Sequence, residues 1–312
     1  MEIVGIRAQG MAGAFVAVSD DASATWWNPA GLAHGAFANV IVEGGVLQQP
    51  RVEQAPGGLA QPAWGTGTWG VSFGYPALGL SYYRLRISEI RAIDSTATTS
   101  VSRQDQGPAS VLERSLVVNQ WGVTVGQSLG DHLVVATTVK LLYGGLGSAV
   151  VSASGASLDS AAALDGAGEA HGTLDVGAMA TLGRVQVGFV GRNLVEPTFT
   201  NAIDSETLTR QARVGVAFMG ERVTAALDAD LTRVPTAVGD ERHVAGGVEA
   251  WFVHRRLAAR GGVSVNTTGS ARPAVAAGAS VGLRSSLFFD GQFTGGSDEA
   301  RRGWGLDLRV TF

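Results

Sequence analysis

The chain has 312 residues and a formal net charge of −4, with 44 glycines, no cysteine and a mean hydropathy of +0.16. No run approaches the roughly 18 consecutive apolar residues that a membrane-spanning helix needs. The mild acidity and the lack of a basic stripe argue against nucleic acid as a partner. The absence of cysteine is compatible with an oxidising envelope compartment where disulfides are not used.

The first 35 residues lack the alternation of a spanning strand. Positions 10–18 are small and apolar, and Ser19, Asp20 and Asp21 then offer side-chain oxygens that can cap a short helix over 22–27. The Asn28-Pro29 step ends this helix, because a proline disfavours helical geometry in the preceding residue. The residues leave two interpretations open: a short helix that packs on the end of a fold, or a functional plug.

Alternation of apolar and polar residues predicts about fourteen strands from Phe37 onward. The expected strands span 37–47, 67–75, 77–88, 114–129, 132–145, 172–182, 184–194, 209–219, 221–232, 242–253, 256–266, 272–284, 285–294 and 302–312. Most have about the ten residues that a tilted transmembrane strand requires. The connections are long at 48–66, 89–113, 146–171 and 195–208, and tight at Pro76, 130–131, Gly183, Gly220 and 254–255. Short turns at one end and longer loops at the other are typical of outer-membrane barrels.

The last nine residues have one apolar and one polar face. Trp304, Leu306, Leu308, Val310 and Phe312 share one face, and Gly305, Asp307, Arg309 and Thr311 share the other. This ending resembles the C-terminal strand of bacterial outer-membrane β-barrel proteins, which closes the barrel against the first strand. We therefore predict an all-β fold, a transmembrane antiparallel barrel of about 14 strands, with Trp304 and Phe312 at its closure.

Charged residues on the predicted inner faces are the candidates for a site in the lumen. Asp228 and Asp230 share one face of 221–232 and could form an acid pair or bind a cation. The favoured interpretation is a hydrated lumenal wall in which the inward Arg213, Arg260 and Arg309 balance these acids.

The sequence offers no catalytic or metal-binding set. Residues 126–130 match G-x-S-x-G and residues 65–70 match G-x-G-x-x-G, but neither lies in the strand-to-helix context that these motifs need. The five histidines are scattered singly at 34, 132, 171, 243 and 254, without the spacing of a metal site. We expect no enzyme activity and no cofactor.

Three N-terminal stretches carry a family resemblance: residues 10–18 (GMAGAFVAV), 20–24 (DDASA) and 27–32 (WNPAGL). Together they resemble the start of the FadL-type outer-membrane long-chain fatty-acid transporter superfamily, with a closer likeness to its short PorV-like and TraF-like branch. The resemblance implies that residues 1–35 form a hatch, a plug folded inside the lumen, and that residues 36–312 form the barrel.

The resemblance also implies a function, the passage of hydrophobic, fatty-acid-like small molecules across the outer membrane. The ligand would displace the hatch and leave sideways near the third strand, at 77–88. The hatch and ligand-contact residues would be Phe15, Asp20, Asp21, Trp26, Trp27, Asn28 and Pro29. Among them, Phe15, Trp26 and Trp27 would supply apolar contact surface, while Asp20 and Asn28 would tie the hatch to the wall by hydrogen bonds.

The shortness of the chain supports an alternative. Nothing at 48–66 or 89–113 has the pattern of the amphipathic helix pair that forms the outer ligand site in the fatty-acid transporters. The barrel would then be a PorV-like scaffold or shuttle subunit of an envelope or secretion complex, with a protein partner on its extracellular loops. An open diffusion pore is disfavoured because a plug occupies the lumen.

The expected location is the bacterial outer membrane, with membrane lipid as a partner. The first residues of the sequence, Met1 to Val4, have neither the basic n-region nor the apolar h-region of a signal peptide. We therefore expect that the export signal is not part of this sequence.

Overall fold

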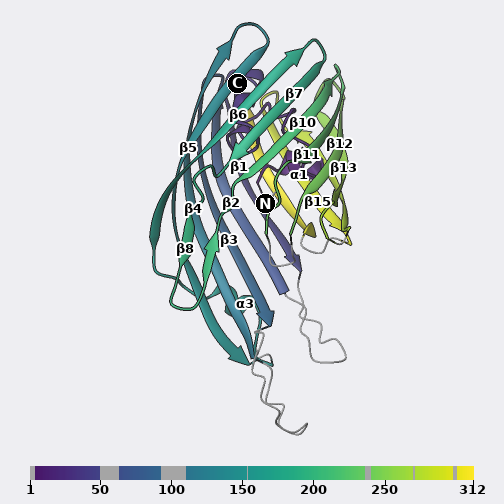
Figure 1. Cartoon of the computed structure of the whole chain (residues 1–312). Helices are drawn as coiled ribbons and strands as arrows, with labels where there is room; N and C mark the ends of the chain where they lie inside the picture. The colour runs from purple at the N-terminus through teal and green to yellow at the C-terminus, as the bar shows by residue number, and fades with distance from the viewer. Residues whose placement is uncertain are drawn as a thin grey trace, which may run out of the picture.

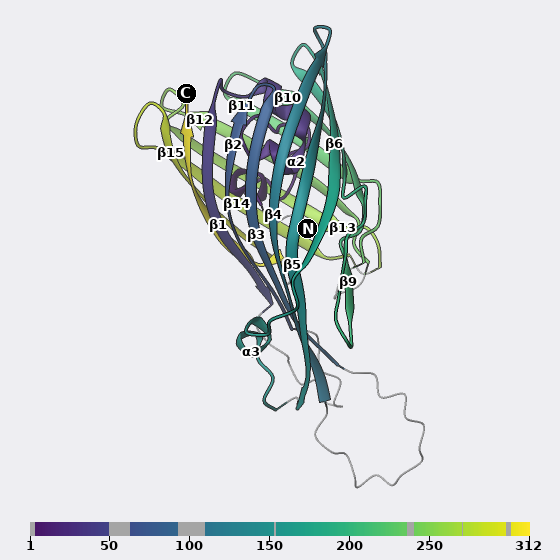
Figure 2. The same ribbon diagram turned by 90° about the vertical axis from the view of Figure 1, so that its left-hand side faces the viewer.

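A closed barrel of antiparallel strands surrounds the N-terminal segment of the chain (Figures 1 and 2). The computed structural model describes residues 4–49, 63–92, 110–152, 154–235, 240–269, 271–297 and 301–312. Within these residues, fourteen strands form the barrel wall. The predicted antiparallel barrel of about 14 strands with a short helix in its N-terminal segment is confirmed.

The elements follow the order that the sequence predicts. The N-terminal segment contains α1 (Ile6–Gly10), α2 (Ala24–Trp27) and the 3-10 helix η1 (Pro29–His34). The first barrel strands are β1 (Asn39–Gln49), β2 (Ala63–Tyr75), β3 (Leu78–Ala92), β4 (Ser110–Leu129), β5 (Leu133–Ser152), β6 (Glu169–Leu182) and β7 (Val185–Arg192). The remaining ones are β10 (Gln211–Met219), β11 (Val223–Asp230), β12 (His243–Phe252), β13 (Leu257–Asn266), β14 (Pro273–Gly282), β15 (Leu287–Gly296) and β16 (Gly303–Thr311). No helix in the described ranges is long and apolar enough to cross a membrane.

The last strand closes the barrel by pairing with the first. In the β1–β16 ladder Trp304 lies opposite Val46, and beyond its end the Phe312 N–H donates to the Ala38 carbonyl at 2.8 Å. Trp304 and Phe312 both face outward, with 53% and 72% of their surface exposed. The C-terminal strand therefore has the apolar outer face and the polar inner face that its alternation predicts.

Alternation sorts the side chains of the whole wall. On β11, Leu227 is exposed on the outer face while its neighbour Asp228 is buried on the inner face. On β14, Val281 is exposed on the outer face and Ser280 is buried on the inner face. Large exposed aromatic side chains on the outer face include Trp69, Trp121, Tyr143, Phe218 and Phe252. An apolar outside and a polar inside are what a barrel in a lipid bilayer requires.

The barrel wall is much taller on one side than on the other (Figure 2). We call β2–β6 the tall wall, since these strands have 13 to 20 residues, and β7 with β10–β16 the low wall, since these have 8 to 10. At about 3.3 Å per residue, β4 and β5 extend roughly 30 Å beyond the low-wall strands. The predicted ranges 67–75, 114–129 and 132–145 were too short because they omit this extension.

Two small elements cover the extension of the tall wall. The helix α3 (Leu158–Ala162) packs on its outer face, where Ala161 contacts a cluster with Ile90 and Val111. The hairpin of β8 (Thr198–Thr200) and β9 (Ser205–Thr207) packs on its inner face, where Phe199 joins Leu116 and Leu142. Both elements lie in segments that the sequence predicts only as long loops. The expected absence of a helix pair at 48–66 and 89–113 falls mainly on residues outside the description.

Candidate functional site

The N-terminal segment fills the lumen and is the candidate site. Every side chain from Val4 to Leu32 is buried, except that of Asp20, which is partly exposed. In Figure 1 this segment lies within the ring of strands, in the part of the barrel nearer the C-terminus. We keep the name hatch for it, with residues 4–35 as its described part.

Asn28 shapes the hatch locally and links it to the wall. Its extended backbone ends α2, as expected for a residue before proline, and its Oδ1 accepts a hydrogen bond from Ala30 N at 3.2 Å to cap η1. Its Nδ2 donates to the carbonyls of Val16 in the hatch and Ala178 in β6, at 2.9 and 3.2 Å. One side chain therefore joins two hatch segments and one wall strand.

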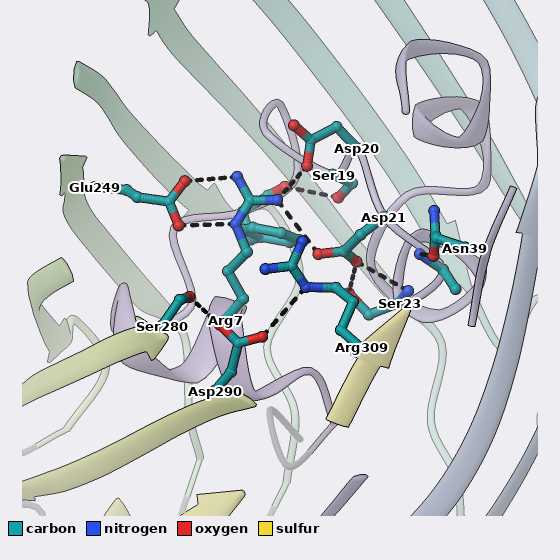
Figure 3. Close-up of polar contacts among 12 residues, drawn as sticks. Arg7, Ser19, Asp20, Asp21, Ser23, Asn39, Glu249, Ser280, Asp290 and Arg309 are labelled. Carbon is teal, nitrogen blue, oxygen red and sulfur yellow. Dashed lines mark hydrogen bonds and ion pairs between the residues drawn. The ribbon is translucent and has the colours of Figure 1, made fainter. Parts of the chain in front are cut away.

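Arg7 of α1 is the main ionic contact between hatch and wall (Figure 3). Its Nε and Nη2 donate to the two carboxylate oxygens of Glu249 on β12, at 2.8 and 2.7 Å. Its Nη1 contacts Asp20 and lies 3.3 Å from Asp21 Oδ2. The bidentate geometry is the strong form of an arginine–carboxylate pair, and here the pair is largely removed from solvent.

Asp20 and Asp21 act within the hatch rather than directly on the wall. Asp21 Oδ1 accepts hydrogen bonds from the N–H and hydroxyl of Ser23, at 3.0 and 2.5 Å, in the turn before α2. Asp20 pairs with Arg7, so its connection to the wall runs through that guanidinium. Burial raises the pKa of Asp20, and the positive charge of Arg7 opposes that rise.

The charge network continues along the inner wall. Arg260 on β13 lies between Glu249 and Asp290, with N–O distances of 3.1 Å to each, and Arg309 on β16 lies 3.2 Å from the second oxygen of Asp290. The expectation that Arg260 and Arg309 balance Asp228 and Asp230 is therefore wrong, because these two arginines pair with Glu249 and Asp290. Strand register brings β12, β13, β15 and β16 together here, and alternation alone does not reveal that register.

Asp228 holds the hatch backbone. Its Oδ2 accepts hydrogen bonds from the N–H groups of Phe15 and Val16, both at 2.8 Å, while the neighbouring acid Asp230 pairs with Arg213 at 2.6 Å. The interpretation of Asp228 as part of a hydrated wall is wrong, since the hatch covers it and leaves 2% of its surface exposed.

Other wall side chains bind the hatch backbone in the same manner. Glu43 on β1 accepts from Gly5 N at 2.7 Å, and Asn39 accepts from Ala22 N at 2.5 Å. Carboxylates and amides that bind free backbone N–H groups satisfy donors that would otherwise be buried without a partner. The hatch is thus hydrogen-bonded around much of the lumen.

Glycines in the wall allow the hatch to approach closely. On nine strands, a β-carbon added to an inward-facing glycine would contact hatch atoms: Gly45, Gly74, Gly79, Gly177, Gly188, Gly215, Gly247, Gly262 and Gly305. At Gly247 and Gly262 that carbon would lie 2.7 and 2.5 Å from the Met11 carbonyl oxygen. At Gly177 it would lie 2.8 Å from Cδ of Pro29. These positions form a glycine ring that fits the hatch backbone against the wall.

The aromatic hatch residues form one cluster that reaches the wall. The rings of Phe15 and Trp27 meet edge to face at 6.1 Å, and Trp26 meets Tyr83 of β3 in the same way at 5.4 Å. The guanidinium of Arg192, at the end of β7, lies 4.4 Å from the centre of the Trp26 ring. Arg192 is 9% exposed, and its guanidinium forms no hydrogen bond or ion pair with the described residues. A buried cation beside an aromatic face gains from the negative face of the ring, but its N–H donors remain unsatisfied.

The hatch leaves little empty space. A cavity beside it, lined by Val16, Trp27, Val190, Arg192 and neighbouring wall residues, measures about 20 Å³. That volume holds about one water molecule and no organic ligand. The conformation described here is therefore closed.

The sequence-predicted site residues gather in the hatch, while their partners escaped prediction. Phe15, Trp26 and Trp27 cluster, Asp20 and Asp21 meet at Arg7, and Asn28 with Pro29 packs on β6. Sequence reasoning missed Arg7, Glu249, Asp290, Arg192 and the glycine ring. Alternation could have placed the charged wall residues on the inner face, but nothing in the sequence specifies which carboxylate meets which arginine.

The other sequence motifs do not contribute to this site. Residues 65–70 lie within β2, and residues 126–130 end β4 and enter a tight turn in which Gly130 has a positive φ of 72°. His34 contacts Thr181 at 2.9 Å, and burial lowers its pKa. Across the described ranges, no group of three or more His, Cys, Asp or Glu side chains is placed to hold a metal ion.

The fold with its plugged lumen is that of the FadL-type barrels, to which solved structures of the same architecture belong. A monoaromatic hydrocarbon channel, CymD, is 12% identical with a TM-score of 0.69, over 99% of this chain and 97% of that one. A Pseudomonas aeruginosa FadL homologue is 10% identical with a TM-score of 0.62, over 99% and 98%. The Ralstonia pickettii toluene transporter TbuX is 13% identical with a TM-score of 0.62, over 100% and 99%. At these identities the likeness establishes the fold, and none of the three is named as an enzyme.

The sequence itself identifies the family. A family model described as "F plasmid transfer operon, TraF, protein" matches residues 53–230, more than half of the chain. The chain belongs to this TraF family, as the TraF-like part of the resemblance implies. A comparison with curated protein sequences found no match.

Proposed function

We propose that this protein passes hydrophobic small molecules across the outer membrane through a lumen that the hatch closes. One observation carries the proposal: a buried hatch blocks a barrel that aligns over nearly its whole length with hydrocarbon channels and transporters. We also propose the division of the chain into a hatch of residues 1–35 and a barrel of residues 36–312. In support, η1 ends at His34 and β1 begins at Asn39.

An apolar track on the tall wall supports a hydrophobic cargo. The inward-facing side chains of Trp64, Leu47, Leu85 and Tyr83 belong to the same cluster as the hatch aromatics, and Trp64 is only partly buried. They lie on β1, β2 and β3 and lead from the long-loop end toward Trp26. Apolar residues aligned inside a polar lumen suit a ligand that is poorly soluble in water.

Arg192 supports a ligand that has a polar head as well as an apolar body. Its unpartnered guanidinium lies beside Trp26, where the apolar track ends. A carboxylate there would form a charge-assisted hydrogen bond with a group that otherwise remains unsatisfied. Fatty acids have this chemistry, whereas the monoaromatic hydrocarbons named for the similar channels do not, so the two cargo classes can be separated by experiment.

Passage requires a conformational change. The lateral exit expected at 77–88 coincides with β3, whose residues 78–92 pair without a gap with β4. Pairing with β2 is also continuous, over residues 78–90. In the described conformation that exit is closed, so we propose that the hatch shifts before a ligand can leave by any route.

The test is equilibrium binding of oleate and of toluene to the detergent-purified full chain. We expect saturable binding of at least one ligand, weakened about tenfold or more in W26A/W27A, which is about 1.4 kcal/mol or more. The matched control is W69A/W121A, which removes two outward-facing tryptophans and should leave affinity unchanged. R192Q should weaken oleate binding and spare toluene if Arg192 binds the carboxylate.

The family description supplies the second candidate. The matching family model is named for a transfer operon, and as the alternative we propose a PorV-like scaffold that holds a protein partner on its extracellular loops. If neither ligand binds or crosses a proteoliposome membrane, while heat-modifiable gel mobility shows an intact barrel, transport is refuted and the scaffold becomes the better account.

A further inference from the structure

Exposed arginines gather at the short-turn end of the low wall. They are Arg184, Arg222, Arg256 and Arg284, each in a different tight turn. Their side chains form no hydrogen bond or ion pair within the part of the chain that the structure describes. We call these four residues the arginine rim. Four unpaired cations along one edge of a protein whose net charge is −4 need an explanation.

Backbone hydrogen bonds place these turns next to one another. The Arg184 carbonyl accepts from Met219 N at 2.7 Å, at the end of β10, and the Arg222 carbonyl accepts from Trp251 N at 2.8 Å, on β12. The Arg256 carbonyl accepts from Gly282 N at 2.6 Å, at the end of β14 and two residues before Arg284. Each turn therefore adjoins the next, and the arginine rim is continuous along the low wall.

The tall wall lacks this feature. Its tight turns, at 76–77 and 130–132, contain no arginine, and the second carries Asp131 instead. Arg255 shares a turn with Arg256, but its guanidinium lies 5.6 Å from the Trp251 ring centre, and we do not include it in the rim. The turns of the arginine rim carry one exposed acid, Glu221 beside Arg222, against four arginines, so the positive charge at this end of the barrel is one-sided.

The arginine rim borders the lipid-facing surface. Exposed apolar side chains flank it on the outer face of the same strand ends: Leu182, Val185, Val223, Leu257 and Leu283. Arginine stems can lie along such a surface while the guanidinium reaches the polar boundary of the bilayer. A guanidinium binds a phosphate through two parallel hydrogen bonds, which an ammonium group cannot match.

We propose that the arginine rim binds anionic phospholipid headgroups in the leaflet that faces the short turns. Short turns of such barrels face the periplasm, so the ligand is a phosphodiester lipid of the periplasmic leaflet. The cations follow the edge of the lipid-facing band over four turns. This spread fits a row of headgroups better than one compact acidic protein. The inference does not depend on what crosses the lumen.

Native mass spectrometry of the detergent-purified full chain tests the proposal. The probes are dioleoylphosphatidylglycerol and dioleoylphosphatidylcholine, which share their acyl chains and differ in net charge. We expect the wild-type protein to retain phosphatidylglycerol at least about tenfold more tightly, because each arginine near an anionic lipid surface is attracted to its headgroups. In R184Q/R222Q/R256Q/R284Q the preference should disappear, and added salt should weaken it in the wild-type protein.

The control neutralises four exposed arginines nearer the long-loop end, R86Q/R210Q/R233Q/R302Q, with the same change in net charge. It should keep the wild-type preference. The readout is a ratio between two lipids, so a general loss of stability would not by itself abolish the preference for phosphatidylglycerol. Heat-modifiable gel mobility verifies that each variant forms a folded barrel. A wild-type protein without preference, an unaffected rim variant, or an equal loss in the control would each overturn the proposal. If the wild-type protein shows no lipid preference, an acidic periplasmic protein becomes the better candidate ligand of the arginine rim.

Discussion

Arg7 combines more hatch contacts than any other side chain of the ionic network. It binds Glu249 of the wall through two nitrogens and meets two aspartates of the hatch through the third. Charges in such a buried position persist only when each has a partner, because desolvation of a lone ion costs several kcal/mol. The position of the hatch is therefore sensitive to this one residue.

Replacement of Arg7 by glutamine should unseat the hatch. The change leaves Asp20, Asp21 and Glu249 without their common cation, and loss of one partner from a buried network costs about 3–5 kcal/mol. We expect channel openings in planar bilayers that the wild-type protein does not show, together with faster proteolysis of the N-terminal segment.

The matched control for Arg7 is R86Q, which neutralises an exposed arginine on β3. It should leave both conductance and proteolysis at wild-type values. Unchanged conductance in R7Q, in a barrel of normal gel mobility, would show that the ionic contacts do not hold the hatch.

The glycine ring gives a second test with single residues. A β-carbon at Gly262 would lie 2.5 Å from the Met11 carbonyl oxygen, so G262A forces the hatch or β13 to move. Overpacking of this kind typically costs about 1–3 kcal/mol. We expect a lower thermal midpoint and increased leak conductance.

Gly67 provides the control for this substitution. It also lies in a barrel strand, but a β-carbon there would meet nothing within 4 Å. G67A should therefore match the wild-type protein. Equal effects of the two substitutions would mean that G262A acts through the strand and not through the hatch.

At the scale of elements, two arginines of the tall wall contact the β8–β9 hairpin: Arg91 lies 3.2 Å from Asp204, and Arg114 makes more of the ionic contacts. Arg114 on β4 lies 3.3 Å from Glu89 of β3 and 3.2 Å from Asp204, and it also contacts Glu206 of the hairpin. These contacts lie on the inner face of the tall-wall extension and involve none of the residues that bind the hatch. Hairpin and hatch should consequently respond to different substitutions.

R114Q should loosen the hairpin and spare the hatch. Loss of hydrogen bonds to charged groups costs about 1.5–3 kcal/mol. Limited proteolysis should cut within residues 195–210 several times faster than in the wild-type protein, while bilayer conductance stays at the wild-type level. Protection of that segment in R114Q would mean that the remaining contacts, such as Arg91 with Asp204 and the apolar packing of Phe199, are enough to hold the hairpin.

The sequence predicts the strands well and the tall-wall extension poorly, for a physical reason. A strand such as β16 has lipid on one face and a polar lumen on the other, so its two faces differ in composition. The outer halves of β4 and β5 have α3 on one face and the hairpin on the other, so both faces are buried and alternation fades. Helices and hairpins as short as these leave no periodicity to detect.

The candidate site is predictable only in part, because its ionic contacts depend on strand register. Trp26, Trp27 and Asn28 stand out because tryptophans and an Asn-Pro step in a small apolar segment are unusual. Glu249 and Asp290 do not stand out, because each is one polar residue on a strand where polar residues alternate with apolar ones. Their role follows from the register of strands about 240 or more residues away from Arg7 in the chain.

At the scale of the whole molecule, the hatch separates a sealed barrel from a pore. Deletion of residues 4–35 should leave a wall whose pairing does not involve the hatch, since β1 pairs with β16 and β2 without it. The vacated lumen is lined by charged side chains that water can solvate. We expect the deleted protein to form steady ion-conducting channels, whereas the full chain remains closed in planar bilayers.

The outcome of this deletion is informative in both directions. Steady channels with normal heat-modifiable mobility would show that the barrel folds without its plug. An unfolded product would show that the hatch is an integral core, held by wall side chains as far apart in the sequence as Asn39 and Gln292. In that case the hatch could not leave the lumen as a unit.

The order of assembly follows from the distribution of hatch contacts along the chain. Arg7 binds Glu249, Gln9 accepts a hydrogen bond from Gln292, and the Phe15 N–H donates to Asp228, so the hatch finds these partners in the last third of the sequence. Long-range contacts of this kind form late in folding. Meanwhile β1 stays unpaired on one edge until β16 arrives. Closure of the barrel and enclosure of the hatch therefore belong to one final step, and a chain truncated before β16 would lose both.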